Sequence, residues 1–456
     1  MKARPLTKLF GAIGLCALAV ATFAPISSAA TPFPGCSWPV ESTPTTANIF
    51  YPDSNSTYWT TPYRIKPGMK IYLRGAYPTA RYFSVTAYDS SAQPYTVDSV
   101  GSSLTDYQIA PSVGRNPWSV GAWTATASGL YSITLRSLTG TGGVTGSLRN
   151  TLPIAPKYPA AGYLPADIGF IMVRVYLPPE LNFAAISLPS ITIKEAGKQA
   201  VTLKRCGGGE GTRKLNLSGV GRKILKLLKG GTAPAKPPCP PGQKGCPPNL
   251  AFFVPPSGSD IPFPNTTSGY AAAFFTPQQG KVVVIKAKIP TSPYDYGSGR
   301  GSGELPVPWP RNDAARWQVR YWSLCNYVYQ APYPVVVAPG ANGTTIYGCV
   351  ADLQSPTTAD STITAVLSYP ADRPVNATYA NGIAWLPMST STPNAVEQVS
   401  LRNMLVASTF KTTPKSATGE SVAAAKKAMG AYYPQAAMCT TVTFESGGAA
   451  ACFASG

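Results

Sequence analysis

The chain of 456 residues contains no histidine. Nucleophilic catalysis by Ser-His-Asp or Cys-His arrangements is therefore excluded, and so are zinc, copper and non-haem iron sites that depend on imidazole ligands. Carboxylate acid–base catalysis, lysine or tyrosine chemistry and cation binding by oxygen ligands remain available. The chain could also be without catalysis. We expect no cofactor.

Acidic residues are scarce as well: 12% of the residues are charged and only 19 are Asp or Glu. A glycosidase needs two carboxyl groups about 5–10 Å apart. No local pattern provides such a pair, and Asp98 with Asp106 is supported only by closeness in sequence. An Asp-rich calcium loop and a Gly-rich phosphate loop after a strand are also missing. The sequence thus predicts no catalytic residues and no metal site.

Long apolar stretches are missing beyond the N-terminus. There, three basic residues precede an apolar stretch that small residues follow: Lys2, Arg4 and Lys8, then 9–23, then Ser28-Ala29-Ala30. This order is typical of a secretory signal peptide over residues 1–30, cleaved before Thr31. An uncleaved anchor is the alternative, but the stretch is shorter than the roughly 20 residues of a spanning helix. We expect a mature chain without a transmembrane segment, secreted or held in the periplasm or cell envelope.

Eight cysteines follow the leader. An even number in an exported chain favours disulfides over thiols or zinc ligands. Sequence spacing leaves several connectivities open, and the pairs that close local segments are the ones we predict. These pairs are Cys36–Cys206, Cys239–Cys246, Cys325–Cys349 and Cys439–Cys452.

Positive charge dominates the chain, whose formal net charge is +19, three charges of which lie in the leader. Inside a cell this balance would indicate nucleic acid. Export makes an anionic component of the cell envelope, such as a glycan, the expected partner instead, and no nucleic acid is expected. A sparsely charged surface without a partner is the alternative.

A segment of the chain recurs at a constant offset. The residues Tyr51-Pro52, Tyr58, Tyr63, Gly68 and Pro78 match Phe263-Pro264, Tyr270, Phe275, Gly280 and Pro290. Both copies then carry Arg-Tyr-aromatic-Ser, at 81–84 and 320–323, and later Leu-Pro, at 152–153 and 386–387. A repeated pattern of this length indicates an internal duplication.

Short runs rich in Val, Ile, Thr and aromatic residues, separated by 47 Pro and 42 Gly, predict an all-β chain. The clearest strands are 71–74, 82–88, 131–136 and 170–176, then 282–285, 317–324, 363–367 and 396–401. Alternation within 82–88 favours a sheet with one buried face. Each copy is long enough for its own core. We therefore predict two tandem, duplicated β-sandwich domains of jelly-roll type.

The predicted domain limits are 31–206 and 250–410, with a linker at 207–249 and a C-terminal segment at 411–456. The linker combines a basic amphipathic helix over about 221–229 with a Pro-rich loop. Its cations could contact anionic lipid, or its apolar face could pack on a domain; they are Arg222, Lys223, Lys226 and Lys229. A last helix is predicted near 418–429, capped by Thr418 or Ser416 and ended by Gly430.

Several longer motifs resemble a family of exported bacterial proteins of unknown function. They are Tyr51-Pro52-Asp53 with Tyr58-Trp59, 80–84 with Tyr88-Asp89, Asn116-Pro117, 320–325, 369–374, 385–387 and 429–434. The resemblance covers nearly all of the mature chain. It implies export and a duplicated sandwich, and it assigns no activity. The Pro-rich linker departs from the family pattern.

Arg81 and Arg320 hold the same place in both copies. They could clamp anions or carboxylates in two equivalent pockets. Alternatively, each pairs with a nearby acid such as Asp89 or Asp372 and fixes a strand end. Asp372 with Arg373 could likewise form a site, or could stabilise a turn.

Trp118 and Trp309 lie in predicted loops, where their rings could stack on sugars. Together these features favour a non-catalytic envelope or cell-surface module that binds an anionic glycan, a lipid surface or a partner protein. A carboxylate-dependent glycan hydrolase and a structural envelope scaffold are the alternatives.

Overall fold

The computed structural model describes residues 36–118, 129–138, 147–156, 166–206, 250–255, 262–293, 317–330, 332–356 and 358–455. These residues belong to one compact unit, Pro32–Gly456. No helix within these ranges has the length and apolar character needed to cross a bilayer. The predicted leader and the linker helix lie outside the described residues.

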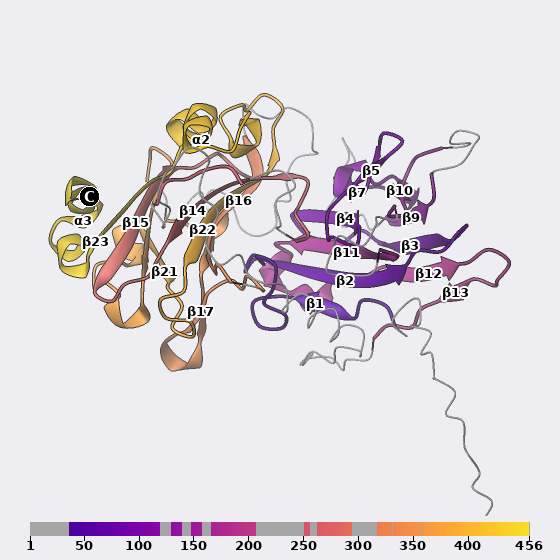
Figure 1. Cartoon of the computed structure of the whole chain (residues 1–456), viewed down its shortest axis with the longest axis horizontal. Helices are drawn as coiled ribbons and strands as arrows, with labels where there is room; N and C mark the ends of the chain where they lie inside the picture. The colour runs from indigo at the N-terminus through magenta and orange to yellow at the C-terminus, as the bar shows by residue number, and fades with distance from the viewer. Residues whose placement is uncertain are drawn as a thin grey trace, which may run out of the picture. The chain divides into compact units, whose positions relative to one another are not determined.

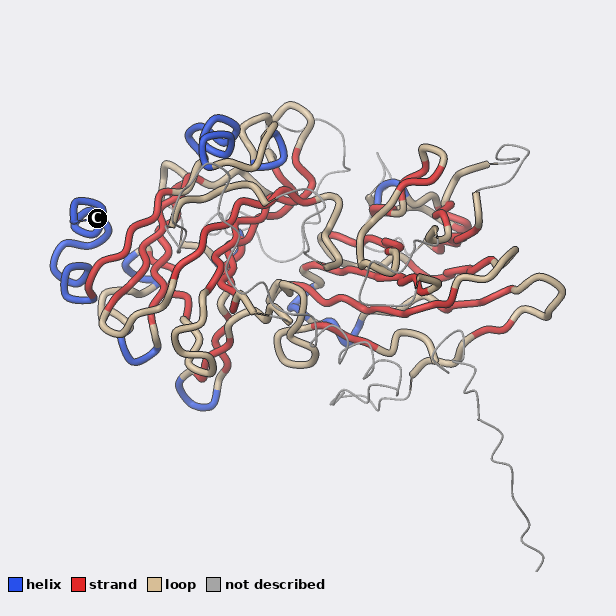
Figure 2. The backbone as a smooth tube through the Cα atoms, viewed as in Figure 1, coloured by secondary structure: helices blue, strands red, loops and turns tan. Residues whose placement is uncertain are grey.

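The all-β prediction is confirmed (Figures 1 and 2). In the first half, one sheet has the order β1-β2-β11-β4-β7. Its strands are Val40–Ser42, Ser56–Arg64, Ile168–Tyr176, Tyr82–Tyr88 and Ser103–Thr105, in that order. The second sheet has the order β10-β9-β3-β12-β13, with β8 (Pro111–Val113) paired to β9. These strands are Thr151–Pro153, Leu130–Arg136, Lys70–Ala76, Ser190–Lys194 and Val201–Thr202. A small hairpin joins β5 (Thr96–Val97) to β6 (Val100–Gly101).

The second half repeats this plan. One sheet has the order β14-β22-β16-β19, with strands Ser268–Phe275, Glu397–Val406, Val319–Val328 and Cys349–Ala351. The other has the order β21-β20-β15-β23, with strands Ile383–Pro387, Thr362–Ser368, Lys281–Lys288 and Gln435–Thr440. A ribbon pairs β17 (Val337–Pro339) with β18 (Thr345–Tyr347).

The two halves have the same strand order, and equivalent strand pairs also agree in being parallel or antiparallel. The Leu-Pro strands β10 and β21 are each parallel to their neighbour, β9 and β20, whereas the other pairs in the four large sheets are antiparallel. Gly68 and Gly280 precede β3 and β15 with φ values of +65° and +69°. Glycine adopts this left-handed conformation without a steric penalty, which explains why both copies have glycine there.

Two α-helices flank β23, the last strand of the second half. The predicted helix is present as α2 (Val422–Met429) and ends at Gly430. Its cap is Ser421, whose hydroxyl accepts from the Ala424 N–H, so the predicted caps Thr418 and Ser416 are wrong. Helix α3 (Thr441–Ser455) was not predicted. Its glycine pair at 447–448 weakens the sequence signal, because glycine disfavours helix interiors.

Strand β4 is buried along its whole length, and the prediction of a single buried face is wrong. One side of the strand faces the core of the first half, with Phe83 and Val85. Its other side, with Tyr82 and Tyr88, belongs to a hydrophobic cluster shared with residues of the second half. The face predicted to meet solvent therefore meets the other copy.

Three predicted disulfides are present: Cys36–Cys206, Cys325–Cys349 and Cys439–Cys452. The first joins the two ends of the first half, and the second lies between β16 and β19. The predicted Cys239–Cys246 pair lies outside the described residues.

Candidate functional site

Four arginines are buried in the described part of the chain: Arg81, Arg174, Arg320 and Arg402. Buried charges are rare unless they are paired, so each needs a partner. Arg81 and Arg320 begin the repeated Arg-Tyr-aromatic-Ser motifs, in front of β4 and within β16. Arg174 and Arg402 lie on β11 and β22.

Arg81 and Arg320 pair with acids of the opposite half. Arg81 contacts Asp352 at 2.5 Å, and Arg320 contacts Asp106 at 2.6 Å. The predicted partners Asp89 and Asp372 are therefore wrong. The sequence could not reveal this, because each true partner lies more than 200 residues away and is brought close by the packing of one half on the other.

The two acids are themselves equivalent. Asp106 directly follows β7, the strand that pairs with β4 at Ser84. Asp352 directly follows β19, the strand that pairs with β16 at Ser323. Burial raises the pKa of both carboxyls, and the arginine partner opposes that shift. The pairs are thus reciprocal: each half supplies one arginine and one acid to a buried double ion pair. Each of the two arginines that were considered as anion clamps thus already has a carboxylate partner within the chain.

Arg174 and Arg402 form a second reciprocal arrangement. Arg174 is opposite Tyr58 and Ser84 in its sheet, and Arg402 is opposite Tyr270 and Ser323. Each guanidinium lies over two tyrosine rings, with centroid distances between 5.3 and 5.8 Å. Such contacts stabilise a cation on the faces of the rings.

Each of these arginines also donates to a backbone carbonyl of the opposite half. Arg174 donates to Phe263 at 2.6 Å, and Arg402 donates to Tyr51 at 3.4 Å. Tyr51 and Phe263 are equivalent in the duplication, and both have φ of 56°. Bulky residues rarely adopt this left-handed conformation, and strain of this kind gathers at functional sites.

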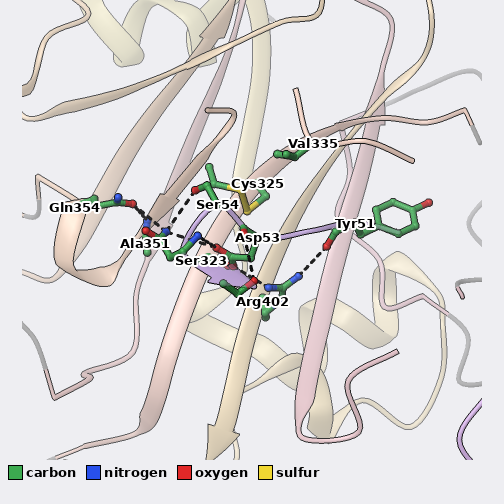
Figure 3. The surroundings of a disulfide bond; sticks show 12 residues. Tyr51, Asp53, Ser54, Ser323, Cys325, Val335, Ala351, Gln354 and Arg402 are labelled. Atoms are coloured by element: carbon green, nitrogen blue, oxygen red, sulfur yellow. Dashed lines mark hydrogen bonds and ion pairs between the residues drawn. A yellow bond between two sulfur atoms is a disulfide. The ribbon is translucent and has the colours of Figure 1, made fainter. Parts of the chain in front are cut away.

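The symmetry ends at one position. Asp53 accepts from Arg402 at 2.7 Å and from the hydroxyls of Tyr321 and Ser323. Figure 3 shows Asp53, Ser323 and Arg402 beside the disulfide of Cys325. The residue equivalent to Asp53 is Asn265. Its amide oxygen accepts from the Tyr82 hydroxyl, the counterpart of the bond from Tyr321, but an amide brings no negative charge.

Arg174 consequently has no carboxylate partner among the described residues, whereas the other three buried arginines each have one. It is 2% exposed, and its Nη1 has no hydrogen-bond partner. The surrounding tyrosines cannot balance the charge, because burial raises the pKa of Tyr88 to about 12 and also raises that of Tyr82. A buried cation without a counter-charge is costly, and the hydrogen bond between Arg174 and the Tyr88 side chain supplies no negative charge.

Arg174 lines two adjoining cavities. One is a small chamber with a volume of about 40 Å³, which also contains Arg402, Asn265 and Gln398 on its wall. The other is a more apolar gap of about 30 Å³ bounded by side chains of β1, β2 and β11. Each has room for only one or two water molecules. Four residues line both spaces: Phe50, Tyr58, Arg174 and Phe263.

A third cavity is much larger, with a volume of about 500 Å³, and is lined mainly by hydroxyl groups and by Tyr95 and Tyr107. None of these three cavities has Asp or Glu in its lining. Burial raises the pKa of Glu397 to about 7, but Ser389 and Asn326 occupy its two oxygens, and it lines none of the three. They therefore offer no carboxylate pair for glycan hydrolysis.

Asp53 and the sulfurs of Cys325 and Cys349 lie within 4.8 Å of one another. The two sulfurs are joined in a disulfide, and metal binding by cysteine requires the thiolate. This group of residues is therefore not a metal site in the oxidised protein.

The remaining predicted site residues lie apart from this cluster. Trp118 is 1% exposed and packs near Tyr77 and Phe83, so its prediction as a surface residue is wrong. Asp89 accepts backbone N–H groups of its own turn, at Ser91 and Gln93.

Asp372 and Arg373 have separate partners. Asp372 accepts from the Gly280 N–H, while Arg373 lies over the Trp385 ring and donates to the Ala377 carbonyl. Trp309 and the basic residues Arg222, Lys223, Lys226 and Lys229 lie outside the described residues.

Sequence reasoning missed Arg174, Arg402 and Asp53 as site residues. A signal for Asp53 was present, because the constant offset aligns it with Asn265 and shows a charge in one copy only. The arginines carried no such signal, since their offset differs from that of the first motif and only strand register aligns them.

No protein-family model matches the chain, and no curated protein matches it. Among solved structures, it is similar to an uncharacterised protein from Burkholderia cenocepacia, with 12% identity and a TM-score of 0.41 over 87% of this chain and 79% of that one. A protein from Vibrio parahaemolyticus has 10% identity and a TM-score of 0.37, over 81% of this chain and 88% of that one. Neither name states an activity.

Proposed function

We propose that this is an exported, non-catalytic binding protein that captures an anionic, carboxylate-bearing ligand at Arg174. The observation that carries the proposal is the buried guanidinium of Arg174, which lines a cavity with an unpartnered Nη1. Arginine remains charged at any physiological pH, so an anion that enters the cavity gains a charge-assisted hydrogen bond.

The duplication indicates which anion fits. At Arg402, the equivalent guanidinium contacts one oxygen of the Asp53 carboxylate at 2.7 Å. A ligand carboxylate at Arg174 would supply the negative charge that Asp53 supplies in the other half and that Asn265, at the equivalent position, lacks. The predicted export and the positive net charge, +19 for the whole chain and +16 without the three charges of the leader, agree with a ligand found in or near the cell envelope.

The basic segment of the linker lies outside the described residues, and its contact with an anionic surface stays a prediction. A glycan hydrolase and a passive scaffold receive less support. The three cavities above lack acids, and a scaffold has no need of an unpaired buried cation.

Calorimetric titration and thermal unfolding with acetate, glucuronate and inorganic phosphate test the proposal. We expect a carboxylate to raise the melting temperature of the wild type, because a ligand that binds only the folded state stabilises it. Arg174→Gln should abolish this effect, while Arg174→Lys should retain part of it. Because Arg174 has no carboxylate partner that its replacement would leave unpaired, neither variant should unfold the protein. Equal stabilisation of the Gln variant, or no carboxylate effect on the wild type, would reject the proposal.

A further inference from the structure

The cavity beside the β5–β6 hairpin has a volume of about 500 Å³, more than ten times that of either cavity beside Arg174. Sites for small ligands commonly have about 300–1,000 Å³, so this cavity has room for a small organic molecule. The first half contributes the hairpin, strand β7 and the turn that follows it, and the second half contributes Thr266 and Thr267. The cavity is therefore formed by both halves together.

The duplication supplies a second copy of this place, and there the space is bridged. The constant offset aligns Thr267 with Asn55. The turn Asp106–Gln108 likewise corresponds to Asp352–Gln354, because the two turns follow the equivalent strands β7 and β19. Asn55 is fully buried, and its side-chain amide donates to Gln354 Oε1 at 3.1 Å. An amide on the loop of one half thus reaches the turn of the other half.

At the cavity, the same position carries a different side chain. The Thr267 hydroxyl bonds to the Tyr82 hydroxyl and to Asn265 Oδ1, at 2.9 Å each. Threonine has no side-chain amide that could reach Gln108 as Asn55 reaches Gln354. The substitution between the copies therefore leaves a space on one side of the molecule that the other side fills.

The lining of the cavity is polar but uncharged. Its described residues include no Asp, Glu, Lys or Arg, and six of them are Ser or Thr. A charged ligand would exchange its hydration for walls without a counter-charge, at a cost in free energy. A hydrocarbon would remove water from the wall hydroxyls and offer them no hydrogen bond in return. The lining therefore favours an uncharged ligand with many polar groups.

The polar groups of the lining keep bonding capacity for such a ligand. The Ser102 hydroxyl accepts from the Tyr95 N–H, and because a hydroxyl has one donor and two acceptor sites, this bond fixes the group without exhausting it. Gln108 Oε1 accepts from the Thr105 N–H. The side chain of Gln108 is exposed, and its NH₂ group brings two further donors. The cavity thus presents donors and acceptors together, as the hydroxyl groups of a sugar require.

Two tyrosines complete the lining, Tyr95 buried and Tyr107 half-buried. Aromatic rings have an apolar face, against which the C–H groups of a sugar ring can pack. We infer that the cavity binds an uncharged sugar unit, either a free monosaccharide or the end of a neutral glycan. The inference goes beyond the proposed function and is independent of it, because the described lining shares no residue with the cavities beside Arg174.

Saturation-transfer NMR on the whole protein tests the inference with glucose, galactose, mannose and N-acetylglucosamine as probes. We expect saturation transfer to at least one of these sugars. Glucosamine, galactosamine and mannosamine, held in their ammonium forms, are the charged counterparts. They should bind at least about tenfold more weakly than the best neutral sugar, because the described lining offers no counter-charge.

Two substitutions locate the sugar. Thr267→Asn should reproduce the bridge that Asn55 makes to Gln354, fill the cavity and weaken binding at least about tenfold, without lowering the melting temperature. Gln108→Leu removes the exposed amide and should weaken binding roughly fivefold through the lost hydrogen bonds. The control is Thr345→Asn, an exposed threonine on β18 outside the cavity, which should leave binding unchanged. Thermal unfolding verifies that each variant is folded.

The results overturn the inference in three ways. If no neutral sugar bound the wild type, the cavity would have another role. If the amino sugars bound as tightly as the neutral ones, the absence of charge in the lining would not decide the ligand. If binding survived in Gln108→Leu and in a folded Thr267→Asn variant, the sugar would lie elsewhere. None of these results bears on carboxylate binding at Arg174, so the two proposals stand or fall separately.

Discussion

Asp53 and Asn265 occupy the same position in the two halves of the chain, and only Asp53 carries a charge. The Asp53 carboxylate lies 2.7 Å from the Arg402 guanidinium and neutralises its charge. Asn265 lies on the wall of the cavity that Arg174 lines. The duplication thus acts as an internal control, because one copy shows what an anion does for the buried arginine and the other copy lacks it.

Asn265→Asp should close the site. The new carboxylate would stand at the place equivalent to Asp53, neutralise Arg174 and accept from Tyr82 as Asp53 accepts from Tyr321. We expect acetate binding to weaken at least tenfold and the melting temperature of the ligand-free protein to rise. Calorimetric titration and thermal unfolding measure both effects. Unchanged binding in this variant would show that the anion does not sit on Arg174.

The matched substitution is Asp53→Asn, which leaves Arg402 buried without a counter-ion. Removing one partner of a buried pair costs about 3–5 kcal/mol, so the free energy of unfolding should fall by that amount. Ligand binding at Arg174 should persist at temperatures where the variant is folded.

The Arg320–Asp106 pair should be important for stability. Asp106→Asn would orphan a fully buried guanidinium, at a cost of about 3–5 kcal/mol, measured by urea denaturation. The exposed Arg64–Asp167 pair, with side chains 33% and 29% exposed, is the control, and Asp167→Asn should cost no more than about 1 kcal/mol. Equal losses for the two variants would contradict this.

Glu397 should make stability depend on pH. Burial raises its pKa from 4.5 to about 7, so the folded protein holds a proton that the unfolded chain has released between these values. The contribution of Glu397 to the free energy of unfolding is fully present below about pH 4.5, decreases as the pH rises toward 7, and stays constant above pH 7. The whole decrease is about 3 kcal/mol.

Urea denaturation at pH 5, 6, 7 and 8 tests this dependence. Glu397→Gln should flatten the decline, because the amide does not titrate. Glu195→Gln is the control, since lysine partners lower the pKa of that carboxyl and it stays charged throughout. A decline that persisted in the Glu397 variant would assign it to another group.

Thiol titration of denatured, unreduced protein should find no reactive cysteine after the leader. Three pairs are present in the described residues, and the predicted Cys239–Cys246 pair accounts for the remaining two. Two free thiols per chain would show that Cys239 and Cys246 are not joined in a disulfide. More than two would contradict the three described disulfides.

The sequence by itself predicted the fold class, eight of the 23 described strands and three disulfide pairs. Side-chain alternation and turn residues predict strands, as for 82–88, and short separations favour closures such as Cys439–Cys452, whereas the Cys36–Cys206 pair was predicted because it brackets the first copy. The repeated motif also aligns Arg81 with Arg320, and the constant offset aligns Asp53 with Asn265, without reference to the fold.

Only the tertiary structure decided what these residues do. Arg81 and Asp352 are 271 positions apart, and no local pattern predicts which acid a buried arginine will meet. The packing of one half on the other buries the second face of β4 and brings four arginines together with three acids. Trp118 is buried within the core of the first half itself. The imbalance at Arg174 follows from that packing, because a missing charge has consequences only where water is excluded.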